Sequence, residues 1–542
     1  MKNEIERELS RLDVRKKRME QKEFIIFLIA ILLVVLIINI PGLIQDYRGY
    51  RMSGTILVEV LDKNRKEIVI HEGTTSIKDR AFENCVNLTS VTIPNSVTSI
   101  GEKAFYGCKN LTSVTIPDSV TRIGIGAFLG CVNLTSVTIP DSVTSIGESA
   151  FSGCVNLTSV TIPKSVTRVG YGAFSGVKNI KLSSANTSFL LDKSGALIRK
   201  SDNTLIYVPA GIINFTVPDS VTSIGERAFV GCKNLTSVTI PDNVTSIGER
   251  AFSGCKNLKS VTIPNSVTSI GIGAFNGCRG LTSVTIPNSV TRIEDWAFSG
   301  CANLTSVTIP NSVTSIGNEA FSGCVNLTSV TIPDRVSSIG DGAFSGVKNI
   351  KLSSANTSFV LDKSGALIQK SDNSLIYVPS GVINFTVPKS VTSIGKKAFS
   401  GCRGLTIVTI PDSVTSIGKK AFSGCKNLKS VTIPDSVTSI GEDAFSHCIN
   451  LTDITIPKTV ARIELGTFYW CRNLRRITIP NSVTSIEDFS FAGCANLTSV
   501  TIPDSVTRIG ICAFSGCKSL KEVSVSKNCD VDFTVGCKIT RR

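Results

Sequence analysis

The sequence LTSVTIPDSVTRIGIGAFLGCVN, residues 111–133, decides the fold of this 542-residue chain. Nearly the same 23-residue unit recurs from about residue 77 to residue 520, and a cysteine marks its register in most copies. Self-similarity at a fixed period of this length is typical of a solenoid or another array of small repeats. We therefore expect a repeat solenoid, in which each coil contacts chiefly its two neighbours.

Apolar and polar residues alternate in two short stretches of the unit. Leu111, Val114 and Ile116 are spaced to face a core, which leaves the intervening Ser and Thr on the solvent side. The segment 119–123 repeats the alternation and predicts a second short strand, and the Ala-Phe pair that follows predicts a single helical or 3₁₀ turn. Each coil would add its aliphatic residues and one Phe to a single continuous core, with the phenylalanines forming one spine.

Most of the 18 cysteines occupy one position of the repeat. Val177 and Val347 replace Cys at that position, so it requires a small apolar side chain. Stacked strands lie about 4.8 Å apart, which leaves equivalent Cβ atoms too distant for easy bridging. A ladder of buried free thiols is therefore favoured, with disulfides or a metal as the alternative. Cys529 and Cys537 lie outside the ladder, in the C-terminal tail, and are a candidate disulfide that would hold the last coil.

The composition excludes several functions. The net charge of +15 is scattered over variable positions of the repeat, interpreted as turns, such as Arg122 and Arg292. Scattered charge is typical of a solvated surface, with attraction to anionic cell surfaces as the alternative. No basic patch interleaved with aromatic residues is present, so nucleic acid is not expected as a partner. The two histidines, His71 and His447, form no metal or triad spacing, so we predict no enzyme activity, cofactor or metal.

Residues 24–44, FIIFLIAILLVVLIINIPGLI, form an apolar run long enough to cross a hydrocarbon core of about 30 Å. Basic residues cluster before this run and few follow it, which predicts a cytoplasmic N-terminus and repeats outside the cell. A cleaved signal peptide is the alternative, but the segment before the run is long and no small-residue cleavage site follows. We expect an uncleaved signal anchor, a transmembrane helix that holds the repeats at the cell surface.

Two longer stretches interrupt the repeat and match each other almost residue for residue at an offset of 170 residues. Turn signals between apolar runs predict in each a β-hairpin or three-strand flap that projects from an enlarged coil. Residues 51–72 alternate in a similar way and predict a hairpin that caps the first coil. The expected organisation is a cytoplasmic stub (1–23), a transmembrane helix (24–44), a linker and hairpin cap (45–76), repeats (77–177), an insert (178–231), repeats (232–347), an insert (348–401), repeats (402–520) and a C-terminal cap or tail (521–542).

The unit L-x-x-V-x-I-P-x-S-V-T-x-I-G-x-x-A-F-x-G-C-x-N resembles the leucine-rich repeat of the BspA-like family of cell-surface proteins, over roughly residues 75–525. The D-K-S-G-A-L-I and L-I-Y-V-P segments of the inserts resemble a longer repeat variant of that family. The resemblance implies a right-handed solenoid with a parallel sheet on its concave face. It also implies attachment to host matrix or plasma proteins, or to other cells.

Departures from the repeat are the candidates for a ligand site. The segment 464–476 introduces Trp, Tyr and Arg, the residue types that dominate protein-binding hot spots. Sequence drift near the end of the array is the alternative explanation. We predict binding of extracellular proteins or cell surfaces; a structural spacer or coat protein without a ligand, and polysaccharide binding along the exposed Ser–Thr rows, are the alternatives. The candidate binding residues are Tyr469, Trp470, Arg472, Arg475 and Arg476, with Trp296 as a second, separate candidate.

Overall fold

The computed structural model describes residues 46–542, with the exception of residues 48, 159 and 533–536. The predicted stub and the predicted transmembrane helix at residues 24–44 lie outside the described residues. Within the part of the chain that the structure describes, no helix is both long enough and apolar enough to cross a membrane. The chain divides into two compact units, Met1–Asn186 and Thr187–Arg542.

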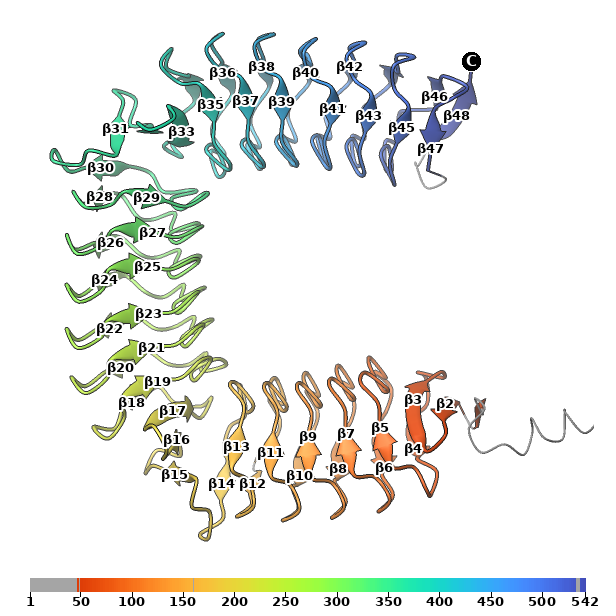
Figure 1. Ribbon diagram of the computed structural model, residues 1–542, viewed down its shortest axis with the longest axis vertical. Helices are drawn as coiled ribbons and strands as arrows, with labels where there is room; N and C mark the ends of the chain where they lie inside the picture. The colour runs from red at the N-terminus through yellow and green to blue at the C-terminus, as the bar shows by residue number, and fades with distance from the viewer. Residues whose placement is uncertain (1–45, 48, 159, 533–536) are drawn as a thin grey trace, which may run out of the picture. The chain divides into compact units, whose positions relative to one another are not determined.

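Among the described residues of the first unit the strands form three sheets, ordered β1-β2-β3-β5-β7-β9-β11-β13, β10-β8-β6-β4 and β12-β14 (Figure 1). The strands are β1 Asp46–Tyr47, β2 Tyr50–Ser53, β3 Ile56–Val60, β4 Glu67–Val69, β5 Ser76–Ile77, β6 Ser90–Thr92, β7 Ser99–Ile100, β8 Ser113–Thr115, β9 Arg122–Ile123, β10 Ser136–Thr138, β11 Ser145–Ile146, β12 Thr161–Ile162, β13 Arg168–Val169 and β14 Lys181–Leu182.

The second unit begins within the first insert, at Thr187, and continues with the same kind of coil. Its first strands are β15 Phe189–Leu191, β16 Leu197–Arg199, β17 Thr204–Tyr207, β18 Asn214–Thr216, β19 Ser223–Ile224, β20 Ser237–Thr239, β21 Ser246–Ile247, β22 Ser260–Thr262, β23 Ser269–Ile270, β24 Ser283–Thr285, β25 Arg292–Ile293, β26 Ser306–Thr308, β27 Ser315–Ile316, β28 Val330–Ile332, β29 Ser338–Ile339 and β30 Ile350–Leu352. They form sheets ordered β15-β16-β17-β19-β21-β23, β18-β20-β22-β24-β26, β25-β27-β29 and β28-β30.

The second insert begins the remaining coils. Their strands are β31 Phe359–Leu361, β32 Leu367–Gln369, β33 Ser374–Tyr377, β34 Asn384–Thr386, β35 Ser393–Ile394, β36 Ile407–Thr409, β37 Ser416–Ile417, β38 Ser430–Thr432, β39 Ser439–Ile440, β40 Asp453–Ile454, β41 Arg462–Ile463, β42 Arg476–Thr478, β43 Ser485–Ile486, β44 Ser499–Thr501, β45 Arg508–Ile509, β46 Glu522–Val525, β47 Asp530–Val531 and β48 Lys538–Arg541. The sheets are β31-β32-β33-β35-β37-β39, β34-β36-β38-β40, β41-β43-β45-β47, β42-β44 and β46-β48.

Both predicted strands of the 111–133 unit are present. β8 buries Val114 and exposes the Ser and Thr on either side, as the alternation predicts. β9 is shorter than expected and buries Ile123. β8 pairs in parallel with β6 and β10, and β9 with β7 and β11, each time between residues one coil apart. Each coil therefore contributes to two rows of parallel strands, as the two predicted strands of the unit require.

The Ala-Phe segment forms isolated hydrogen-bonded turns of the 3₁₀ (i→i+3) kind and, among the described residues, no longer helix. The N–H of Leu129 donates to the carbonyl of Gly126 (2.9 Å), and that of Cys131 donates to the carbonyl of Phe128 (3.2 Å). Gly126 has a φ of 58° and Gly130 a φ of 76°. Backbone that enters the left-handed region twice within so few residues cannot continue a right-handed helix.

Gly124 lies where successive coils approach each other closely. A Cβ at Gly124 would lie 2.5 Å from the carbonyl oxygen of Gly101 in the preceding coil. We predict that Gly124→Ala lowers the free energy of unfolding by about 2 kcal/mol, because the coils must move apart. At Gly211 an added Cβ meets no atom within 4 Å, so Gly211→Ala should change stability by less than about 0.5 kcal/mol. Equal effects of the two variants in denaturant unfolding would contradict this explanation.

The N-terminal hairpin lies earlier in the chain than predicted. β2 pairs with β3 in the antiparallel sense, with Ser53 opposite Ile56. The two segments expected to pair with each other, β3 and β4, belong to different sheets. β3 pairs in parallel with β5, and β4 pairs in parallel with β6. Each of these segments therefore takes the place of one strand of a coil and extends its own row.

Each insert contains a three-stranded antiparallel element, but this element extends a sheet and does not project as a flap. β15, β16 and β17 pair antiparallel in succession, and β17 then pairs in parallel with β19. The second insert repeats the arrangement with β31, β32, β33 and β35. The same order begins the first unit, where the β2–β3 hairpin precedes the parallel strands. Each insert therefore begins a new sheet.

The phenylalanines stack within runs of coils and not along the whole chain. Phe252, Phe275 and Phe298 lie nearly parallel, with ring centroids 5.1 and 5.4 Å apart. At the second insert Tyr377 meets Phe344 edge-on, at 6.2 Å and 78°. The buried residues of the second unit form two clusters that meet in this insert. The predicted single continuous core and single spine are therefore wrong, because the insert interrupts the stack.

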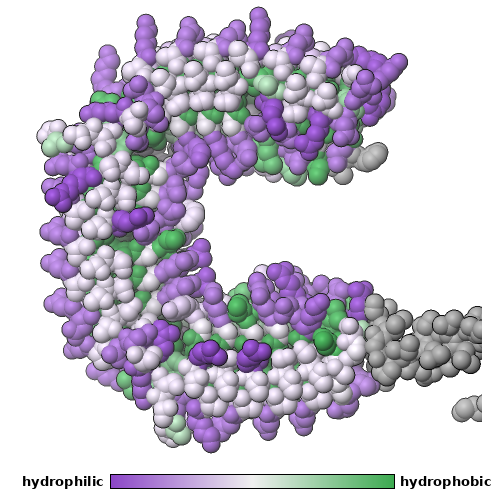
Figure 2. All heavy atoms as spheres, viewed as in Figure 1, coloured by the Kyte–Doolittle hydropathy of each residue, from purple (hydrophilic) through white to green (hydrophobic). Residues whose placement is uncertain are grey.

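The ladder cysteines are buried free thiols. The Sγ–H of Cys131 donates to the carbonyl of Phe105 in the preceding coil, at 3.1 Å. Burial raises the pKa of the Cys154 thiol to about 12. Val177 and Val347 are fully buried at the same position, which agrees with the prediction that it requires a small apolar side chain. Outside this core, the face seen in Figure 2 is mostly polar or neutral, with hydrophobic residues in small patches.

Candidate functional site

Three of the predicted binding residues, Tyr469, Trp470 and Arg472, meet on the turn of one coil. The guanidinium carbon of Arg472 lies 4.3 Å from the centroid of the Trp470 ring, which is a cation–π geometry. Tyr469 lies edge-on to Trp470, with centroids 6.2 Å apart and planes at 63°. Trp470 is 36% exposed, so its ring remains accessible to a partner.

His447 completes this group and was not among the predicted binding residues. Its ring is nearly parallel to that of Trp470, at 6.2 Å and 8°, and lies edge-on to that of Tyr469, at 5.4 Å and 62°. His447 stands one repeat before Trp470, at the same position of the unit. This shared position is the feature of the sequence from which contact between the two rings could have been predicted. The four residues His447, Tyr469, Trp470 and Arg472 are called the aromatic cluster below.

The backbone of the aromatic cluster is in a conformation that favours glycine. His447 and Trp470 both have a φ of 59°, and the neighbouring coils have Gly424 and Gly493 at the same position, with φ values of 76° and 80°. A non-glycine residue held there costs about 1 kcal/mol. The Trp470 ring also lies against Gly493, where an added Cβ would come within 3.0 Å of the indole. Two successive coils therefore carry ring side chains in place of a conformationally easier glycine.

Two predicted residues lie on a different part of the coil. Arg475 immediately precedes β42 and Arg476 is its first residue, opposite Ser499 of β44. Both side chains belong to an exposed sheet row, while the aromatic cluster belongs to the turn. The structure thus divides the predicted group into a turn cluster and a pair of sheet arginines.

Trp296 lies apart from the aromatic cluster. It is 38% exposed and has a φ of 55°. The next residues of its coil, Ala297 and Phe298, pack in one core cluster of the second unit. The coil of Trp470 packs in the other core cluster, through residues such as Cys471. The structure therefore does not bring the two tryptophans together.

The candidate cap disulfide is not formed, so this prediction is corrected. Cys529 and Cys537 are both free thiols. Cys529 directly precedes β47 and Cys537 directly precedes β48, and these strands belong to different sheets. Burial, together with the neighbouring Cys517, raises the pKa of the Cys537 thiol to about 11. Among the described residues, no group of three or more His, Cys, Asp or Glu side chains could hold a metal ion.

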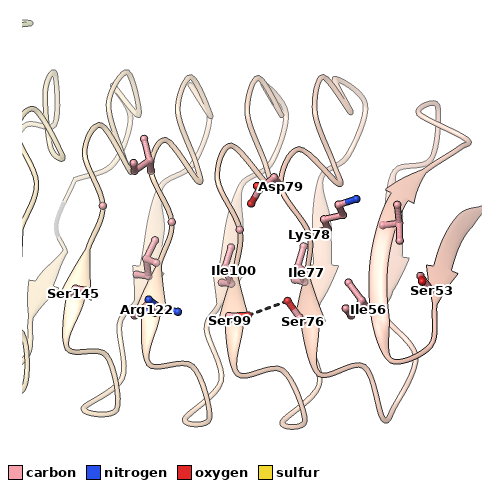
Figure 3. Close-up of a pocket in the computed structure, with 16 residues that line it drawn as sticks. Ser53, Ile56, Ser76, Ile77, Lys78, Asp79, Ser99, Ile100, Arg122 and Ser145 are labelled. Carbon is pink, nitrogen blue, oxygen red and sulfur yellow. Dashed lines mark hydrogen bonds between the residues drawn. The ribbon is translucent and has the colours of Figure 1, made fainter. Parts of the chain in front are cut away.

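A groove of about 530 Å³ crosses the largest sheet of the first unit (Figure 3). A row of outward side chains from successive strands lines it: Ser76, Ser99, Arg122 and Ser145. The hydroxyls of Ser76 and Ser99 are hydrogen-bonded at 2.9 Å. The groove was not predicted from the sequence because its residues come from separate coils. Arg122 was expected in a turn, whereas it is the first residue of β9.

The fold defines the class of protein. Short parallel strands recur once per coil in each row, and the turn asparagines form a ladder in which Asn133 donates to Asn110 at 3.3 Å and accepts from Asn156 at 3.3 Å. These are features of a leucine-rich-repeat solenoid. The chain belongs to the BspA-type leucine-rich-repeat family, whose repeat region matches residues 61–181, 207–301, 268–369, 372–465 and 438–531.

Two solved structures illustrate the similarity. A leucine-rich cell surface protein from Faecalibacterium prausnitzii is 32% identical, with a TM-score of 0.46, over 63% of this chain and 96% of that one. A leucine-rich-repeat protein from Eubacterium ventriosum is 27% identical, with a TM-score of 0.50, over 65% of this chain and 92% of that one. A comparison with curated proteins found no match.

Proposed function

We propose that this protein is displayed on the cell surface and binds other proteins there through the aromatic cluster. The partners proposed are host matrix or plasma proteins, or proteins of other cells. Similarity to a cell surface protein of F. prausnitzii supports the location. The apolar segment 24–44 supports an N-terminal membrane anchor with the repeats outside.

The aromatic cluster is the observation that carries this proposal. Trp, Tyr and Arg are the residues most enriched at binding hot spots. Here they are held in place before any partner arrives, because Trp470 is stacked with His447 and contacted by Arg472. A partner would lose little side-chain entropy on binding such a group. The backbone strain at two of the four residues has no evident role in folding, since glycine fills the same position in neighbouring coils.

The test is a binding screen with the purified full-length chain in a mild detergent, against arrays of matrix proteins, plasma proteins, whole cells and glycans. We predict that Trp470→Gly weakens the binding of a protein partner at least tenfold, as loss of a hot-spot residue does. The substitution restores the residue that neighbouring coils carry, so the fold should remain. Trp296→Gly, which removes an exposed tryptophan at another positive φ, is the matched control and should leave binding unchanged.

The remaining outcomes of the screen would overturn the proposal. Binding of glycans alone would favour a polysaccharide-binding surface formed by the exposed Ser–Thr rows. Binding of nothing would favour a structural spacer. Equal losses in Trp470→Gly and Trp296→Gly would show that the aromatic cluster is not the binding site.

A further inference from the structure

Near the end of the second unit, a carboxylate is held between two arginines. Glu487 accepts hydrogen bonds from Arg462 at 2.7 Å, from Arg508 at 2.8 Å and from the hydroxyl of Ser485 at 3.0 Å. Arg462, Ser485 and Arg508 stand opposite one another on β41, β43 and β45. The side chain of Glu487 is only 13% exposed. This Arg–Ser–Arg cradle therefore binds a carboxylate from the chain itself.

The first unit contains the same cradle in the same register, but without the carboxylate. Arg122, Ser145 and Arg168 stand opposite one another on β9, β11 and β13. Gly147 occupies the position that Glu487 has in the later cradle. The first cradle therefore has the donors of the later one and lacks its acceptor.

The surroundings of the two cradles also differ in charge, and the first cradle again has fewer carboxylates. In the later cradle a second carboxylate, that of Glu464, lies 3.6 Å from Arg462, and the corresponding residue of the first unit is Gly124. Among the described residues, no carboxylate lies within ion-pair distance of Arg122 or Arg168. Both of these arginines are exposed. Their positive charge is left for an external acceptor.

The first cradle opens into the groove of the first unit. Arg122, Ser145 and Gly147 line that groove, and Figure 3 shows Arg122 and Ser145 in one row with the other outward side chains. Two lining aliphatic residues, Ile56 and Ile125, are 40% and 48% exposed. Lys78 and Asp79 also line the groove. Around the cradle the groove combines a guanidinium, hydroxyls and exposed aliphatic side chains, which complements a protein segment with an acidic residue between apolar ones.

We propose that the cradle formed by Arg122, Ser145 and Arg168 binds a carboxylate of an acidic protein segment. Arginine suits this role because its planar donors match the geometry of a carboxylate. The aliphatic neighbours of that carboxylate pack on Ile56 and Ile125. This inference rests on the proposed role in protein binding but not on the aromatic cluster, which belongs to the other unit.

The first test titrates the full-length chain in detergent with a fluorescent peptide that alternates Glu and Val, followed by anisotropy at low salt. Arg122→Ser and Arg168→Ser should each weaken binding about tenfold, the effect of losing one charged hydrogen-bonding partner. Ser stands at the corresponding position of neighbouring coils, as at Ser99, so both variants should fold. Arg292→Ser is the matched control, because Arg292 already pairs with Glu294 at 3.4 Å, and it should leave peptide binding unchanged.

The second test creates a new site. The double variant Glu464→Gly with Glu487→Gly gives the later cradle the residues of the first one, and it should bind a second equivalent of the same peptide. Failure to gain this equivalent, or an equal loss in Arg292→Ser, would overturn the inference. Binding of polygalacturonate but not of the peptide would also overturn it, since the acceptor would then be a sugar acid.

Two further controls separate this inference from the proposed function. A peptide that alternates Gln and Val should not bind, because it lacks the carboxylate. Trp470→Gly should bind the acidic peptide as the unmodified protein does. Loss of peptide binding in Trp470→Gly would contradict the assignment to the first unit, whereas loss of a matrix-protein partner alone concerns only the aromatic cluster.

Discussion

The repeat region is expected to unfold steeply as the pH is raised from about 9 to about 12. Burial raises the pKa of Cys154, Cys232 and Cys324 to about 12, from an ordinary value of 9.0 for an exposed thiol. Between these values the folded chain keeps the thiol proton and the unfolded chain releases it. The stability that the protonated buried thiols contribute is therefore complete below pH 9, and it is lost as the pH rises towards 12.

The expected effect is large because the thiols act together. Each thiol whose pKa is raised in this way lowers the free energy of unfolding by about 1.4 kcal/mol per pH unit in this window. In the first unit the pKa values of Cys85, Cys108 and Cys154 are raised, so the stability of this unit should fall by about 4 kcal/mol per pH unit. A typical domain has a free energy of unfolding of about 5–15 kcal/mol. Circular dichroism and thiolate absorbance should therefore change together, well before pH 12.

Valine provides the matched control for this prediction, because the chain itself has valine at the ladder position in Val177 and Val347. Cys154→Val removes one of these thiols, so the free energy of unfolding should fall less steeply with pH, by about 1.4 kcal/mol per pH unit. Thiolate that appears near pH 9 while the circular dichroism is unchanged would show that the ladder is accessible to solvent and would contradict the prediction.

Phe275→Ala is expected to lower the free energy of unfolding by about 3–5 kcal/mol, the usual result of removing a large ring from a tight core. Phe275 is fully buried and stacks on Phe252 and Phe298. Neighbouring coils are fixed by their own hydrogen bonds and cannot close the resulting cavity. Denaturant unfolding of the second unit measures the loss.

Phe489→Ala is the control for this second prediction. Phe489 is 40% exposed and has a φ of 55°, so it stands outside the stack and its removal should cost less than about 1 kcal/mol. If both variants lost the same stability, the stacked rings would not be the main source of cohesion between coils.

The sequence was sufficient where a local pattern determines the structure. The spacing of Leu111, Val114 and Ile116 identified the buried face correctly, because alternation in a strand leaves only one apolar side. The same logic failed at the cap, where β3 and β4 each alternate but alternation does not specify the partner strand. Nothing local in the Ala-Phe segment showed that Gly126 takes a positive φ, so the detailed backbone path of the turn could not be predicted.

The sites depend on which coils are neighbours, and this limits what their sequence can reveal. Trp470 and Arg472 were found because they break the repeat within one coil. His447 breaks it one coil earlier, and only stacking brings its ring to Trp470. Arg122 and Arg168 look like scattered charge in the sequence. Their significance appears only when strand register places them as Arg462 and Arg508 are placed around Glu487.

The central claim is that departures from the repeat serve binding and not folding. The most direct test measures the free energy of unfolding of Trp470→Gly together with its partner binding. Glycine accepts a φ near 59° readily, which offsets the loss of the ring contacts. The predicted result is a stability within about 1 kcal/mol of the unmodified protein or above it, with binding at least tenfold weaker. A loss of about 2 kcal/mol or more with binding unchanged would make Trp470 a packing residue and contradict the claim.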